Sequence, residues 1–205
     1  MSGGDARARA LRRTVLVVAG LNLAYFGVEL AVALSAGSVS LLADSVDFLE
    51  DTAVNLLIAL ALGWPLLHRS VMGKAMALVI LGPALVAGWE AVRRVGDPQP
   101  PDVLPVVLAS LGAIVVNGSC AWLLARVRSA GGSMGAAAFL SARNDVLVNV
   151  AIILMGLLTA VTGSGWPDLV LGSFIVLLAL HAAWEVWEVS EEERLAARAL
   201  AGDVD

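Results

Sequence analysis

Two long stretches of this 205-residue chain contain no charged residue, and they decide which class of fold the chain can adopt. They run from Val103 to Ala125 and from Val146 to Pro167. A helix needs about 20 mostly apolar residues to cross the hydrocarbon core of a bilayer, so each stretch is long enough. Hydrophobic residues make up 59% of the chain and charged residues 15%, whereas an ordinary soluble domain carries about 25% charged residues. The sequence therefore predicts an integral membrane protein.

Turn-forming residues divide the chain into six apolar segments, each of which we predict to be a transmembrane helix. The segments cover residues 14–34, 40–64, 71–94, 103–125, 134–160 and 166–188. The first segment is longer than the apolar part of a signal peptide, so we interpret it as a retained helix. We expect an all-α membrane bundle over residues 14–188. A cytoplasmic N-terminal segment (1–13) precedes it, and a short acidic cytoplasmic tail (189–205) follows it.

Arginine and lysine predict the orientation of this bundle. With the N-terminus in the cytoplasm, ten of these residues fall in cytoplasmic segments, and only Arg93 and Arg94 fall on the other side. Positive residues favour cytoplasmic loops, so we expect both termini in the cytoplasm and the protein in a bacterial-type plasma membrane. No basic block indicates a nucleic-acid partner, and the single cysteine permits no intramolecular disulfide.

Five of the acidic residues inside the predicted spans lie in the second and fifth spans, where a charge is unfavourable unless it has a function. The second span contains Asp44, Asp47, Glu50 and Asp51, and the fifth contains Asp145. An ionised side chain at the bilayer centre costs about 2.5–3.5 kcal/mol even on the most lenient scale. Asp47 and Asp51 are four residues apart, so they project from one helix face. With a rise of 1.5 Å per residue, Asp51 and Asp145 both lie about 15 Å from the start of their helices, near the midplane.

A short pattern recurs in these two spans at a displacement of 94 residues, as Asp47-x3-Asp51-x3-Asn55 and Ser141-x3-Asp145-x3-Asn149. With six spans and three in each half, the two helices run in opposite directions. The pattern therefore predicts a 3+3 inverted repeat, in which the substrate site lies near the midplane between the two halves.

We predict a binding site for a divalent cation on these two helices, because carboxylate oxygens suit hard and borderline cations. Its ligands are expected to be Asp47, Asp51 and Asp145, with further positions filled from Asp44, Ser141, Asn144 and Asn149. The alternative is a buried network in which the acids form protonated pairs with each other or Arg143 neutralises Glu50 or Asp44, although one arginine cannot offset so many acids.

The second span resembles the corresponding span of the cation diffusion facilitator (cation efflux) family. That family shows a serine-led Leu-Ala-Asp stretch followed by Asp-x3-Asp or His-x3-Asp, and this chain reads Ser38-x-Ser40-Leu41-Leu42-Ala43-Asp44-Ser45-x-Asp47-x3-Asp51. The fifth span, Asn144-Asp145-Val146-Leu147-Val148-Asn149, is similar to the second half-site of the family.

The resemblance implies a homodimeric secondary transporter in the lipid bilayer, which exports divalent metal ions in exchange for protons. It implies no cofactor, since the metal is the transported substrate, and the candidates are zinc, cobalt, cadmium, iron and manganese. Protons and metal would compete for the same carboxylate oxygens. An intramembrane enzyme is not expected, because no motif places a nucleophile or an acid beside the aspartates.

This sequence departs from the family pattern in two respects. The family usually has His or Asp four residues before the fifth-span aspartate, whereas this chain has Ser141. A hydroxyl is a poorer ligand, and an all-oxygen site weakens the preference for zinc. Family members usually carry a cytoplasmic metal-binding domain after the sixth span, and we expect a short member without it. These departures motivate a second hypothesis, a non-transporting membrane subunit with a metal-binding or regulatory role.

Overall fold

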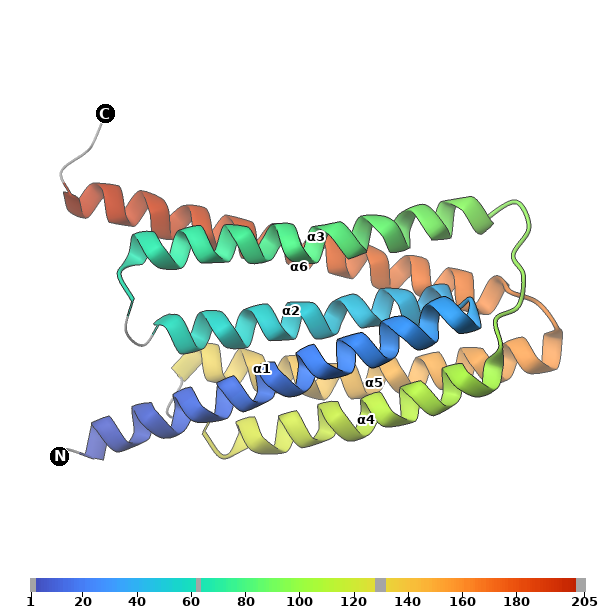
Figure 1. Cartoon of the computed structure of the whole chain (residues 1–205), viewed down its shortest axis with the longest axis horizontal. Helices are drawn as coiled ribbons and strands as arrows, with labels where there is room; N and C mark the ends of the chain where they lie inside the picture. The colour runs from blue at the N-terminus through green and yellow to red at the C-terminus, as the bar shows by residue number, and fades with distance from the viewer. Residues whose placement is uncertain (1–2, 62–63, 128–131, 202–205) are drawn as a thin grey trace.

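The computed structural model describes residues 3–61, 64–127 and 132–201, which form six helices packed as one bundle (Figure 1). The helices are α1 (Gly3–Ala36), α2 (Val39–Ala61), α3 (Leu66–Arg94), α4 (Val103–Ala125), α5 (Gly132–Thr162) and α6 (Trp166–Ala201). The predicted all-α bundle of six helices is confirmed. The start of α1 and the end of α6 lie at the same end of the bundle, as an even number of crossings requires (Figure 1).

The first and last helices extend beyond the spans predicted from hydropathy. α1 begins at Gly3 rather than near residue 14, and α6 continues to Ala201 rather than ending near residue 188. Arginine, glutamate and alanine have high helix propensity, so the end of an apolar run does not mark the end of a helix. α3 begins at Leu66, directly after Pro65. This helix therefore begins five residues before the predicted third span, 71–94.

The acidic helix α2 lies at the centre of the bundle. It contacts α1, α3, α5 and α6, and most of its side chains are buried. Among the described residues, five helices are long and apolar enough to cross a membrane, and α2 is not one of the five. Because its neighbours cover it, its carboxylates face protein rather than lipid. This position explains how a membrane bundle accommodates a helix with four acidic residues.

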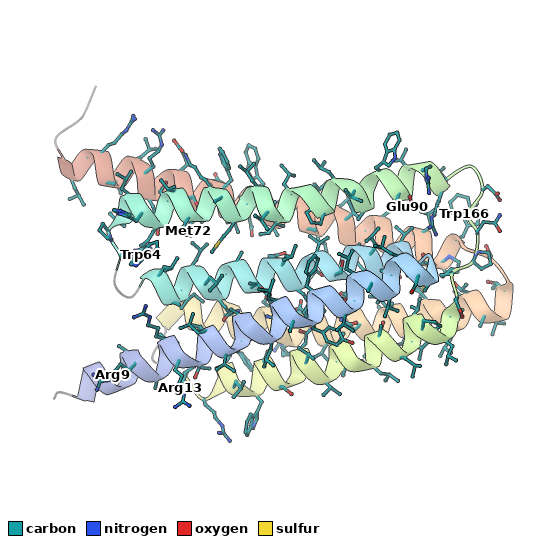
Figure 2. All side chains as sticks on the ribbon, in the orientation of Figure 1. Arg9, Arg13, Trp64, Met72, Glu90 and Trp166 are labelled. Atoms are coloured by element: carbon teal, nitrogen blue, oxygen red, sulfur yellow. The ribbon has the colours of Figure 1, made fainter. Side chains whose placement is uncertain are left out.

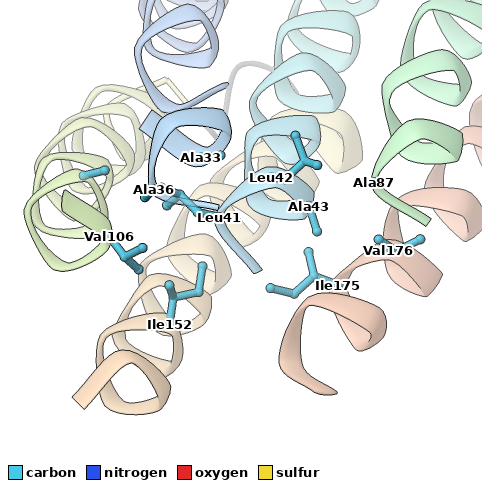
Figure 3. Packing of buried hydrophobic residues seen from close by; sticks show 11 residues of the cluster. Ala33, Ala36, Leu41, Leu42, Ala43, Ala87, Val106, Ile152, Ile175 and Val176 are labelled. Atoms are coloured by element: carbon cyan, nitrogen blue, oxygen red, sulfur yellow. The ribbon is translucent and has the colours of Figure 1, made fainter. Parts of the chain in front are cut away.

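Apolar packing joins all six helices at the end of the bundle opposite the start of α1. Figure 3 shows this cluster, which includes Ala33, Leu41, Ala87, Val106, Ile152 and Ile175. Toward the other end the packing divides, because one cluster joins α1, α2, α4 and α5 and another joins α2, α3 and α6. A groove of about 330 Å³ lies between α2, α5 and α6 at this divided end, with Arg69 of α3 on its wall.

Asp168 of α6 binds the beginning of α2. Its carboxylate accepts hydrogen bonds from the hydroxyls of Ser38 and Ser40, each at 2.6 Å, and from the backbone N–H of Val39 at 2.7 Å. The first N–H groups of a helix have no partner within the helix, and a carboxylate is a favoured acceptor for them. Asp168 is only 4% exposed. This buried network fixes the start of α2, and thereby the level of its aspartates, against α6.

Gly172 allows the close approach of α6 to α2 one turn further along. A Cβ atom at this position would lie 2.6 Å from backbone atoms of Val39 and Ser40. We predict that Gly172→Ala lowers the free energy of unfolding by about 1–3 kcal/mol, because a helix backbone cannot move aside as a flexible side chain can. Gly82→Ala is the matched control, since its Cβ would meet no atom within 4 Å. Unfolding in detergent measures both, and equal effects would contradict the close approach.

Candidate metal site

Four of the aspartates singled out by the sequence line one narrow cavity inside the bundle, which is too small to hold a water molecule. The lining consists of Asp44, Asp47, Phe48 and Asp51 on α2, Asn117 on α4 and Asp145 on α5. Positions 44, 47, 48 and 51 follow the helical repeat, so they share one face of α2. The contact between α2 and α5 brings Asp145 to the same cavity. The predicted convergence of carboxylates from two helices is therefore present in the structure.

Hydrogen bonds from two neighbouring helices orient Asp51. The hydroxyl of Ser141 on α5 donates to Oδ1 at 3.0 Å, and Nδ2 of Asn22 on α1 donates to Oδ2 at 3.2 Å. The Cys120 thiol in turn donates to Oδ1 of Asn22 at 3.6 Å. Ser141 thus contacts a predicted ligand directly, and Asp51 links three helices.

Two asparagines make equivalent hydrogen bonds in the two halves of the chain. Nδ2 of Asn55 donates to the carbonyl oxygen of Asp51 at 2.8 Å, and Nδ2 of Asn149 donates to that of Asp145 at 3.1 Å. Both side-chain oxygens are buried and have no hydrogen-bond partner among the described residues. Because α2 and α5 run in opposite directions (Figure 1), this shared local geometry supports the inverted repeat.

The carboxylates at the centre form no ion pair within the described parts of the chain. The ion pairs that those parts contain join only residues of α3 and α6. The carboxylates of Asp44 and of Glu29 on α1 are both buried, and they lie close enough to form a hydrogen bond with each other when one of them is protonated. An uncompensated buried charge costs several kcal/mol, so bound cations or protons are needed to offset this concentration of acid.

The structure separates Asn144 and Arg143 from this cavity. Both are exposed on α5, and Arg143 donates to Oδ1 of Asn144 at 3.5 Å. Adjacent residues of a helix project about 100° apart, so Asn144 cannot share the inward direction of Asp145. The alternative in which Arg143 neutralises Asp44 or Glu50 therefore has no support in these contacts.

The aspartates share a cavity without forming a complete coordination shell. In residues 3–61, 64–127 and 132–201, no three histidine, cysteine or acidic side chains lie close enough together to hold a metal ion. Binding would require Asp47, Asp51 and Asp145 to move closer to one another. Phe48 was not among the predicted site residues, although its spacing from Asp44 and Asp51 places it on the same helix face.

The family of the cation efflux transmembrane domain matches residues 69–190, which is more than half of the chain. The chain belongs to the cation efflux family. In this cation efflux protein the matched region includes α4, α5 and Asp145, whereas α1 and α2 precede it. The family resemblance proposed from the motifs is thereby confirmed.

Curated relatives cover more of the chain at low identity. The zinc transporter ZitB of Escherichia coli K12 is 28% identical over 197 residues, which cover 89% of this chain and 62% of the relative. The proteins of the same name from Pectobacterium atrosepticum and Yersinia pestis are 26% and 24% identical, over 79% and 78% of this chain and 54% and 55% of their own length. The chain therefore spans less than two thirds of these relatives.

Family membership and helix composition together establish a multi-pass integral membrane protein. Five described helices are apolar enough to span a bilayer, and the family is one of membrane cation transport. This agrees with the expectation of a transporter rather than an enzyme.

Proposed function

We propose that this cation efflux protein exports divalent metal ions from the cytoplasm in exchange for protons, through the cavity that Asp47, Asp51 and Asp145 line. The observation that carries the proposal is the convergence of these aspartates on one cavity without an ion-pair partner among the described residues. Carboxylate oxygens bind divalent cations and also bind protons. The two therefore compete, which couples their movements. The named activity of the relatives, zinc transport, supports the same proposal.

Alternating access would come from the unequal packing at the two ends of the bundle. The groove between α2, α5 and α6 supports access from the end where α1 begins, and the six-helix cluster closes the opposite end. Transport then requires the cluster to separate while the groove closes. The distribution of arginine and lysine supports placing the groove at the cytoplasmic side. A homodimer and a bacterial plasma membrane are proposed from the family resemblance alone.

The oxygen-rich lining bears on which metal is carried. Zinc favours nitrogen and sulfur ligands, whereas manganese accepts carboxylate oxygens well. Zinc, cobalt, cadmium, iron and manganese are all candidate substrates, and Ser141 is the position at which selectivity is most easily changed, because it contacts Asp51.

Ser141→His should shift the preference of the site toward zinc. An imidazole at this position would add a nitrogen ligand beside Asp51, and we expect the ratio of zinc to manganese affinity to rise by about tenfold, which corresponds to about 1.4 kcal/mol. Competition between the two ions in an uptake assay measures the ratio. Ser141→Ala removes the hydroxyl without adding a ligand. If it produced the same shift, the imidazole would not be the cause.

The proposed function is tested by metal uptake into proteoliposomes with an imposed pH gradient. We expect uptake of zinc, cobalt or manganese that follows the gradient and stops when an ionophore dissipates it. Metal uptake at the same rate with and without the pH gradient would contradict exchange for protons. Metal binding without any uptake would instead favour the non-transporting membrane subunit.

A further inference from the structure

The arginine-rich beginning of α1 forms a shallow groove on the outer surface of the bundle. The groove has a volume of about 460 Å³ and is lined by Arg9, Arg12, Arg13, Leu16 and Val17. The spacing of these residues places them on one helix face, and all five are exposed. Figure 2 shows Arg9 and Arg13 at the end of the bundle where Trp64 lies, opposite the end that carries Glu90.

These three arginines have no partner within the described chain, unlike most of the cations of α3 and α6. Most of those cations bind carboxylates, as in Arg69–Glu193, Lys74–Glu191, Arg94–Glu90 and Arg194–Glu191. No ion pair or hydrogen bond joins Arg9, Arg12 or Arg13 to another described residue. Like charges on one helix face repel each other, so an external anion would stabilise this segment.

An exposed apolar surface continues directly from the arginines along α1. Leu16 and Val17 are 44% and 47% exposed, and Leu21 and Leu23 follow them on the exposed side. A Cβ atom at Gly20 would meet nothing within 4 Å, so the surface is open there. From Arg13 to Leu23 the helix rises about 15 Å, which is half of the hydrocarbon core of a bilayer. The surface therefore matches the length of one leaflet.

We propose that this face of α1 binds an anionic phospholipid, with its phosphate at Arg9, Arg12 and Arg13 and an acyl chain along Leu16 and Val17. Guanidinium groups bind phosphate oxygens in pairs, and basic residues beside a membrane span attract anionic lipids. A free phosphate would leave the apolar half of the surface unused. The proposal does not depend on the metal site, because none of these residues lines the aspartate cavity.

The test uses the full chain in nanodiscs that contain equal amounts of phosphatidylglycerol and phosphatidylcholine. Native mass spectrometry counts the lipids that stay bound to the released protein. The test variant is Arg9→Gln/Arg12→Gln/Arg13→Gln. The matched control, Arg126→Gln/Arg143→Gln/Arg198→Gln, removes the same charge from three exposed arginines, one directly after α4, one on α5 and one on α6.

At low salt we expect the test variant to lose its preference for phosphatidylglycerol by roughly 100-fold, if each arginine contributes about 1 kcal/mol. The control should change less than about threefold on the same scale. The proposal would be overturned by a change below threefold in the test variant or by an equal loss in both variants. It would also be overturned if a dimer dissociated in the test variant, because this face of α1 would then bind a second copy of the chain rather than a lipid. Salt should also release phosphatidylglycerol selectively from the unaltered protein. If the unaltered protein retained phosphatidylglycerol equally at low and high salt, that result alone would overturn the proposal.

Discussion

Asp51→Asn should reduce metal uptake by about 100-fold or more while the bundle stays folded. Asparagine keeps the size of the side chain and one acceptor oxygen, but it removes the charge that attracts the cation. Asp51 is also the carboxylate that Asn22 and Ser141 orient toward the cavity, so a neutral side chain there would leave those donors arranged around a poorer ligand. Initial rates of uptake into proteoliposomes measure the effect.

Asp145→Asn should reduce uptake to a similar extent, and the double variant should be little worse than either single one, because ligands of one ion act as a unit. Asp97→Asn is the control, since Asp97 lies in the exposed loop after α3, where Gln99 donates to it at 2.7 Å. Normal uptake in either cavity variant, or an equal loss in the Asp97 variant, would contradict the proposed site.

Asp168→Ala should lower the free energy of unfolding by about 2–4 kcal/mol, the largest stability effect we expect from a single substitution. The change leaves the hydroxyls of Ser38 and Ser40 and the N–H of Val39 without their acceptor in a buried position. Asp168→Asn should be milder, because the amide keeps one acceptor oxygen. Denaturant unfolding in detergent, followed by tryptophan fluorescence, measures the difference.

The matched control for Asp168 is Asp102→Ala. Asp102 occupies the N-cap position of α4, but its side chain makes no hydrogen bond to that helix. Its replacement should therefore change the free energy of unfolding by less than about 0.5 kcal/mol. A loss in the Asp102 variant as large as that in the Asp168 variant would mean that the Asp168 network does not hold α2 in place.

Hydropathy predicted the number of helices because few structures other than an apolar helix can span the hydrocarbon core of a bilayer. It did not predict where the first and last helices end, because Arg- and Glu-rich segments remain helical outside the membrane. α2 shows the converse case. It was predicted as a transmembrane helix, yet its four acidic residues leave it outside the five helices that are apolar enough to cross a membrane, and its contacts with four other helices explain its place.

The aspartates of the candidate site could be predicted from the sequence, whereas the residues that contact them could not. Intervals of three and four residues place Asp44, Asp47 and Asp51 on one helix face, and the repeat places Asp145 opposite them. The partners of Asp51 come from α1 and α5, and no local spacing relates those helices to α2. Asn144 was predicted to fill a further coordination position, yet it adjoins Asp145 in sequence, and adjacent residues of a helix project in different directions.

The most direct test of the metal site is an experimental structure of the protein with manganese or zinc, using anomalous scattering to locate the ion. We expect one anomalous peak between α2 and α5, with carboxylate oxygens of Asp47, Asp51 and Asp145 about 2.0–2.2 Å from it for zinc. A protein that transports metal but shows its peak elsewhere, with these aspartates unliganded, would contradict the account.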